Sequence, residues 1–220
     1  MSSTAQDPGR TAVEACEPRG RTPRAFANVR RDVQRYFGLE SGDGAPSLLR
    51  KLAIVANSPG LHAVLVYRFA SWGNRGLRFT PLRVPMKVVY FLLDKLMSML
   101  WGIHIDKDAR IGPGLYIGHF GGILIGPVTM GRDCNISHNV TMGRRAGGDR
   151  SVPTLGDRVW IGTGCVLFGG IRIGDGTTVG PLTVVGRNVP ARVLVMGNPM
   201  KLLRRDYDNT ADIYGPPRGG

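Results

Sequence analysis

From Ile105 onward, aliphatic side chains recur at every sixth position of the chain. A first run occupies positions 105, 111, 117 and 123; after a slip of one residue near 125–128 it resumes at 130, 136 and 142. A second run occupies 155, 161, 167, 173, 179 and 185, and glycine directly follows five of its six residues. Helices and hairpin sheets have no period of six. The pattern predicts a left-handed parallel β-helix, in which three six-residue units complete each coil.

The candidate catalytic residues lie near the positions where this repeat is interrupted. Residues 144–154 do not fit the period and are expected to project as a loop. His119 and His138 are each third in their unit and lie one coil plus one residue apart, so both are expected on the same side of neighbouring coils. Imidazole titrates near neutral pH and can take a proton from a hydroxyl group. The pair is therefore a candidate catalytic site.

Upstream of the repeat, apolar spacing and breakers predict a small α-helical domain. Its most apolar stretch, 84–105, contains three charged residues and is too interrupted to span a bilayer. We interpret it as an amphipathic helix, with docking on a membrane surface as the alternative. The side chains expected to be buried are Val88, Phe91, Leu92, Leu96 and Leu100. The predicted domains are a disordered basic arm (1–25), the helical domain (26–103), the β-helix with its loop (104–197), and a C-terminal turn and tail (198–220).

Composition narrows the range of partners. The net charge is +13, but no nucleic-acid motif accompanies the arginines, so an anionic ligand or surface is expected rather than nucleic acid. Three scattered cysteines indicate no disulfide framework, and the polar N-terminal stretch shows no secretory signal. These features predict a cytoplasmic protein, with the inner face of the membrane as an alternative location.

Four stretches resemble the hexapeptide acyltransferases, most closely serine acetyltransferase and its relatives: "IGPGLYIGHFGGILIG", "CNISHNVTMG", "GGDRSVPTLGDRVWIGTGCVLFGGIRIGDGTTVG" and "VMGNPMKLL". The resemblance implies a homotrimer, or a hexamer paired through the helical domains. It implies acetyl-CoA as co-substrate in a groove between adjacent β-helices, with no metal. It also implies that His119 is the general base that deprotonates the acceptor hydroxyl.

Further residues receive expected roles from the same resemblance or from their position. Those expected to line the CoA groove are Thr163, Gly164, Gly180, Pro181, Gly197, Asn198 and Lys201. Hexad geometry explains Gly164 and Gly180 equally well, and Lys201 also fits a solvated tail. His138 and Asp106 are expected beside the base, and the acceptor contacts are expected from Asn139, Arg144 and Arg150.

The chain departs from serine acetyltransferases where they hold serine. Where they have an aspartate directly before the base, this chain has Gly118. Where they have a second aspartate, 15 residues before the base, this chain has His104. The histidine that follows Gly-Asp-Arg in their loop is absent. Asp106 is the candidate replacement for the second aspartate. A buried ammonium group without a carboxylate is costly. The sequence therefore predicts an acetyl-CoA-dependent O-acetyltransferase that acts on a sugar hydroxyl in surface or exopolysaccharide synthesis, with serine as the alternative acceptor.

Two other classes remain open at the level of sequence. A carbonic-anhydrase-like enzyme on the same fold would need His104, His119 and His138 to converge on zinc across a subunit boundary. A non-catalytic β-helix would serve as a scaffold attached through its basic arm. The zinc enzyme would leave the glycine-lined groove and the Gly-Asn-Pro turn unexplained, and failure to bind CoA would favour the scaffold.

Overall fold

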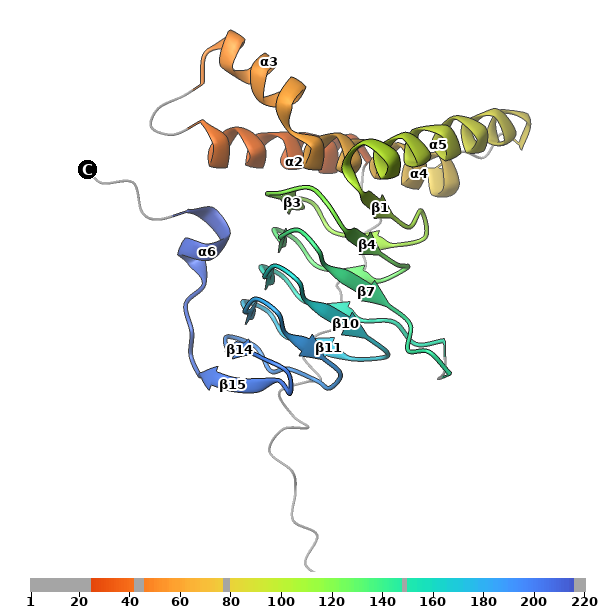
Figure 1. Ribbon diagram of the computed structural model, residues 1–220. Coiled ribbons are helices and arrows are strands. Elements are labelled where there is room, and N and C mark those ends of the chain that lie inside the picture. Colours follow the sequence, from red (N-terminus) through yellow and green to blue (C-terminus); the bar gives the residue numbers. More distant parts are fainter. Residues whose placement is uncertain (1–24, 42–45, 77–79, 148–149, 216–220) are drawn as a thin grey trace, which may run out of the picture.

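The computed structural model describes residues 25–41, 46–76, 80–147 and 150–215. The predicted basic arm, except for Ala25, lies outside the described residues. Four helices come first: α2 (Ala25–Glu40), α3 (Leu48–Asn57), α4 (Pro59–Gly76) and α5 (Thr80–Trp101). They form a layer across one end of a stack of coils (Figure 1). The predicted order of a helical domain followed by a β-helix is confirmed.

The coils form three parallel faces. The first face consists of β1 (Ile103–Ile105), β4 (Ile123–Ile125), β7 (Thr141–Gly143), β10 (Val166–Phe168) and β13 (Val184–Val185). The second consists of β2 (Arg110–Ile111), β5 (Thr129–Met130), β8 (Thr154–Leu155) and β11 (Arg172–Ile173). The third consists of β3 (Tyr116–Ile117), β6 (Asn135–Ile136), β9 (Trp160–Ile161), β12 (Thr178–Val179) and β14 (Leu194–Met196). The fold is the left-handed parallel β-helix that the hexad period predicts.

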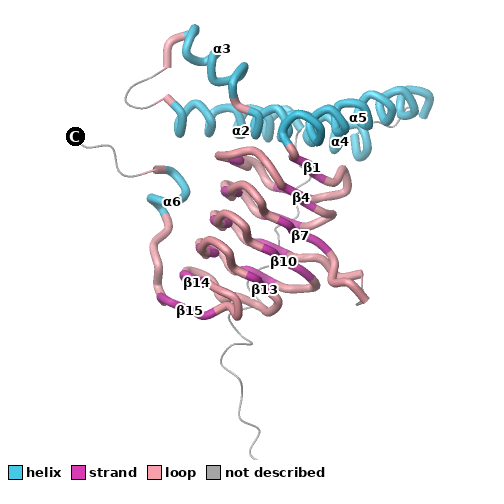
Figure 2. Tube along the Cα trace, in the orientation of Figure 1, coloured by secondary structure: helices cyan, strands magenta, loops and turns pink. Residues whose placement is uncertain are grey.

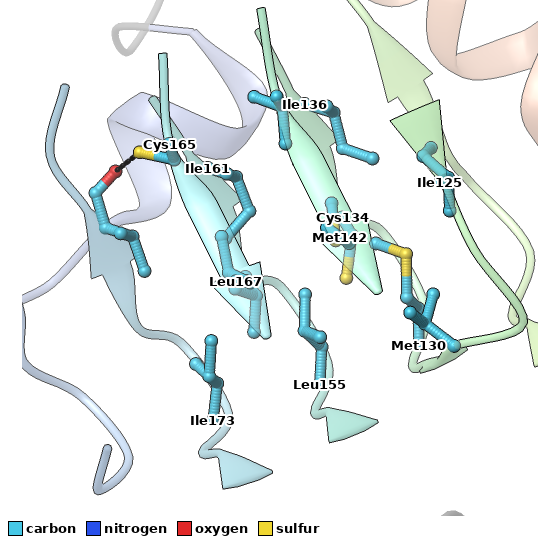
Figure 3. Packing of buried hydrophobic residues seen from close by; sticks show 14 of the residues in the cluster. Ile125, Met130, Cys134, Ile136, Met142, Leu155, Ile161, Cys165, Leu167 and Ile173 are labelled. Atoms are coloured by element: carbon cyan, nitrogen blue, oxygen red, sulfur yellow. Dashed lines mark hydrogen bonds between the residues drawn. The ribbon is translucent and has the colours of Figure 1, made fainter. Parts of the chain in front are cut away.

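The hexad side chains fill the interior of the coils. Figure 3 shows how they stack from coil to coil, and each labelled residue is almost fully buried. Cys134 and Cys165 are free thiols within this core. Burial raises the pKa of the Cys134 thiol to about 12, so it remains protonated near neutral pH.

The slip in the repeat differs from the sequence prediction. Ile125, not Ile123, pairs with Ile105, 20 residues earlier, and with Met142, 17 residues later. The corner that follows β3 is thus two residues longer than a regular corner, and the next unit is one residue shorter. The longer corner is the one that contains His119. The net slip of one residue was predicted correctly, but its place was not.

The orientation of α5 contradicts the prediction. The five side chains that were expected to be buried are between 46% and 59% exposed: Val88, Phe91, Leu92, Leu96 and Leu100. The opposite side of the helix, with Met97 buried and Tyr90 half-buried, faces α4 and β1. Periodicity identifies an apolar face but does not say what covers it. Within the described residues, no helix is long and apolar enough to cross a membrane.

The C-terminal segment returns along the third face. β15 (Lys201–Arg204) pairs antiparallel with β14, and α6 (Thr210–Tyr214) lies beside the coils nearer the helical layer (Figure 2). Asn135 Nδ2 donates a hydrogen bond of 3.1 Å to Asp212 O, and Thr178 Oγ1 donates one of 3.1 Å to Asp212 Oδ2. The described part of this segment is therefore a strand and a helix, in addition to the expected turn.

Candidate active site

One corner of the β-helix collects many of the predicted site residues in a single row. On the third face, one buried aliphatic residue of each coil pairs with that of the next, in the order Ile117, Ile136, Ile161, Val179 and Val195. Two residues beyond them, in the same order, come His119, His138, Thr163, Pro181 and Gly197. Neighbouring coils are about 4.8 Å apart. The row thus runs from the histidines near the helical layer to Gly197 at the far end.

The two histidines contact each other at the start of this row. Their ring centroids are 5.7 Å apart and the rings are nearly perpendicular, at 82°. His119 is exposed and His138 half-buried. The Nδ1 atom of His138 is buried and has no hydrogen-bond partner among the described residues. His119 is therefore open to a ligand, whereas His138 has a buried ring nitrogen whose hydrogen bond the described residues leave unmade.

Helices α2 and α4 fix the coil that carries His119. The Ile117 backbone N–H donates a hydrogen bond of 2.9 Å to the Tyr36 hydroxyl, which is fully buried. At the start of α4, a Cβ atom on Gly60 would come within 2.2 Å of the Ile117 carbonyl oxygen. Only glycine permits such a close approach of two backbones. Both helices are therefore held directly against the residue two positions before His119.

Between these helices and the histidine corner lies a cavity of about 500 Å³. Its lining residues come from the end of α2, the junction of α3 and α4, and the histidine corner. They are Glu40, Asn57, Ser58, Pro59, Gly60, Tyr116, Ile117, Gly118, His119, Phe120 and His138. The volume suits a small acceptor molecule next to His119.

Glu40 brings a carboxylate to this cavity, which sequence reasoning missed. Its Oε2 atom accepts a hydrogen bond of 2.8 Å from Ser58 Oγ, and Ser58 is buried. Burial, followed by the Glu40 charge, raises the pKa of the Tyr116 phenol on the cavity wall. Glu40 belongs to no motif, and its place depends on how α2 packs on the first coil. No signal in the sequence could have identified it.

Asp106 was expected beside His119, and the zinc alternative brought His104 near it only across a subunit boundary; within this chain both lie elsewhere. Asp106 follows β1 and therefore belongs to a different corner; its Oδ1 atom accepts a hydrogen bond of 2.8 Å from the Asp108 backbone N–H. His104 Nδ1 lies 2.9 Å from Asp94 Oδ1 of α5. Within the chain, neither contacts His119. Among the described residues, no group of three or more metal-ligating side chains is placed to hold an ion.

The expected acceptor contacts divide between two corners. Asn139 follows His138 with a φ of 55°, and its side chain packs over Gly122 of the coil above. Arg144 and Arg150 are exposed and belong to the loop that leaves β7, at a different corner from the histidine row. Within one chain the loop does not lie beside the histidines.

The residues expected to contact CoA follow the histidine row. The Gly164 backbone N–H donates a hydrogen bond of 3.1 Å to His138 O, and Gly180 and Gly197 are both linked to the buried Thr183 hydroxyl. Asn198 and Lys201 are exposed near the end of the row, and Lys201 begins β15. The corner thus offers backbone groups along the row, and the exposed Lys201 lies beside its end, paired with Met196.

A parallel β-helix built from six-residue units, with two histidines of neighbouring coils beside a cavity, is typical of the class of hexapeptide-repeat acyltransferases. No family model matches the chain. The serine acetyltransferase of Helicobacter pylori (strain ATCC 700392 / 26695) is 34% identical over 167 residues, which cover 73% of this chain and 91% of that protein.

Two solved structures agree with this relationship. Serine acetyltransferase from Brucella abortus strain S19 in complex with coenzyme A is 26% identical, with a TM-score of 0.69, over 89% of this chain and 72% of that chain. Neisseria gonorrhoeae serine acetyltransferase in complex with serine is 27% identical, with a TM-score of 0.64, over 82% of this chain and 69% of that chain. The chain belongs to the serine acetyltransferase family and is an O-acetyltransferase. The sugar acceptor predicted from the sequence finds no support in these relatives.

Proposed function

We propose that this protein transfers the acetyl group of acetyl-CoA to the hydroxyl group of L-serine. The observation that carries the proposal is the position of His119. It is the first residue of the row that runs to Gly197, and it also lines the cavity. The family relationship supports the acceptor, since a related structure contains serine. A second relative contains coenzyme A, which supports the donor.

In this proposal His119 acts as general base. Its imidazole accepts the proton of the serine hydroxyl, and the oxygen attacks the thioester carbonyl carbon. The C–S bond then breaks, and the imidazolium returns the proton to the sulfur of coenzyme A. The products are O-acetylserine and coenzyme A. We further propose that His138, whose ring centroid lies 5.7 Å from that of His119, orients His119 or contacts the reacting groups.

The remaining expected contacts complete the proposed site. The pantetheine arm of CoA would be bound by Thr163, Gly164, Gly180 and Pro181. The nucleotide end would be bound by Gly197, Asn198 and Lys201. Because the arginine loop leaves another corner, we propose that Arg144 and Arg150 of one subunit reach the acceptor on the next. A homotrimer, alone or paired into a hexamer, would provide this arrangement.

A sugar hydroxyl is the second candidate acceptor, and one observation favours it. The resemblance to serine acetyltransferases implies a carboxylate for the serine ammonium group where this chain has Gly118, and a histidine where it has Ser151. A neutral acceptor would need neither charge. Asn139 and the loop arginines could bind its hydroxyl groups by hydrogen bonds.

The acceptors are distinguished by following coenzyme A release with L-serine and with a panel of nucleotide sugars and oligosaccharides. We expect L-serine to reach a kcat/KM of about 10⁴ M⁻¹s⁻¹ or above, as for a dedicated enzyme. Glycans that react at this level while serine does not would overturn the serine proposal. Failure to bind coenzyme A at all would instead indicate a scaffold.

A further inference from the structure

Glu40 provides the one carboxylate among the described residues that line the cavity beside His119 and His138. The same lining contains no lysine and no arginine. A partly buried carboxylate is stable only when hydrogen-bond donors or a cation compensate for its lost hydration. The Glu40 carboxylate therefore has a hydroxyl donor in the cavity, while the neighbouring Arg50 guanidinium donates a hydrogen bond of 3.0 Å to the Glu40 backbone carbonyl.

The structure holds this carboxylate in a defined place. Ser58 Oγ donates to Oε2 at 2.8 Å, whereas Oε1 has no hydrogen-bond partner among the described residues. One helical turn earlier, Tyr36 is bound to the backbone of Ile117, so α2 is fixed relative to the coil that carries His119. Glu40 is thus a preorganised acceptor, and one of its oxygens is unpaired as far as the described residues go.

Gly118 belongs to the same cavity lining and supplies no carboxylate of its own. A Cβ atom there would approach Tyr116 Cε1 to 3.1 Å, so an aspartate would require the Tyr116 ring to move by a few tenths of an ångström. The carboxylate that lines the cavity is the one from α2. An ammonium group offers three hydrogen-bond donors and a positive charge, both of which suit the Glu40 carboxylate.

We propose that Glu40 binds the α-ammonium group of the acceptor and thereby selects a β-hydroxy α-amino acid over neutral hydroxyl compounds. The inference depends on the proposed serine acetyltransferase activity and adds the residue that selects the acceptor. Glu40 replaces the carboxylate that Gly118 lacks. The serine hydroxyl would then lie between the ammonium contact and His119, within the same cavity.

The test compares wild type, Glu40→Gln and Glu40→Asp, with Asp206→Asn as an exposed control that removes the same charge. KM and kcat are measured for L-serine, together with the KI of 3-hydroxypropionate, which is serine without its amino group. We expect Glu40→Gln to raise the serine KM about 10- to 100-fold, as for a lost hydrogen bond between charged groups. The KI of the analogue and the KM of acetyl-CoA should change by less than about twofold, since neither involves the ammonium group.

The outcomes separate this inference from the proposed function. Unchanged serine KM in a folded Glu40→Gln variant would overturn the role of Glu40 while wild-type serine activity stands. Wild-type protein that acetylates glycans but not serine would overturn both. If Glu40→Gln does not fold, Glu40→Asp decides: we expect a serine KM about three- to tenfold higher, with the analogue unaffected. Equal changes for serine and the analogue would indicate a merely structural role.

Discussion

His119 and His138 lie on neighbouring coils but differ in their surroundings. His119 is exposed on the cavity wall, whereas His138 is half-buried and has a ring nitrogen that no described residue hydrogen-bonds. His119 lies in the corner that is two residues longer than a regular corner. Both histidines line the cavity, and His119 is the more exposed of the two. This geometry favours His119 over His138 as the group that meets the acceptor.

Replacing His119 by alanine tests this assignment. A positioned general base contributes about 10²–10⁴ in rate, so we expect His119→Ala to lower acetyl transfer at least about 10²-fold. Binding of coenzyme A, measured by calorimetry, should be nearly unchanged because the groove row is intact. His104→Ala is the matched control, since that histidine contacts Asp94 and not the site. A His119→Ala variant with near-normal turnover would remove His119 from the mechanism.

At the scale of elements, the helical layer is joined to the first coil by a buried polar cluster. Arg68 Nε donates a hydrogen bond of 2.8 Å to Asp32 Oδ2, and both side chains are almost fully buried. Asp32 Oδ1 also accepts hydrogen bonds from the backbone N–H groups of Gly114 and Leu115, at 2.7 and 3.1 Å. These contacts orient α2, and therefore Glu40, relative to the histidine corner.

Removing Asp32 should destabilise the protein strongly. Asp32→Ala leaves the Arg68 guanidinium buried without its anion and two backbone N–H groups without an acceptor. We expect a loss of about 3–5 kcal/mol in the free energy of unfolding, measured by urea denaturation. Arg132→Ala, which breaks the exposed pair between Arg132 and Asp157, should cost no more than about 1 kcal/mol. Equal losses in the two variants would show that the buried cluster does not anchor the layer.

The sequence predicted the β-helix because each coil is built from local, repeated units. An inward aliphatic residue every six positions specifies both the strand and its place in the core. The row of His119, His138, Thr163, Pro181 and Gly197 follows from the same register. Glu40 could not be found in this way, since its contact with the cavity joins distant parts of the chain. The sequence also could not predict which side of α5 is covered, because two faces of that helix are apolar enough to be buried.

At the scale of the whole molecule, α5 leaves a broad apolar face uncovered. Its exposed side chains are Val84, Val88, Val89, Phe91, Leu92, Leu96, Met99 and Leu100. Large contiguous apolar patches are uncommon on monomeric proteins and mark interaction sites. The arginine loop leads to the same expectation, since within one chain it leaves a different corner from the histidine row. Both features are accounted for if several copies of the chain assemble.

We therefore expect a trimer or hexamer in solution, of about 71 or 143 kDa for chains of 23.8 kDa, by light scattering after gel filtration. The α5 face is expected to pack against a second copy, so Phe91→Glu combined with Leu92→Glu should lower the assembled mass because it places charges in an apolar contact. Arg30→Glu changes the net charge by the same amount at an exposed position of α2 and should leave the mass unchanged. Monomeric wild-type protein that retains full activity on dilution would refute a site shared between subunits. A monomer that binds anionic vesicles through α5 would assign that face to a membrane surface instead.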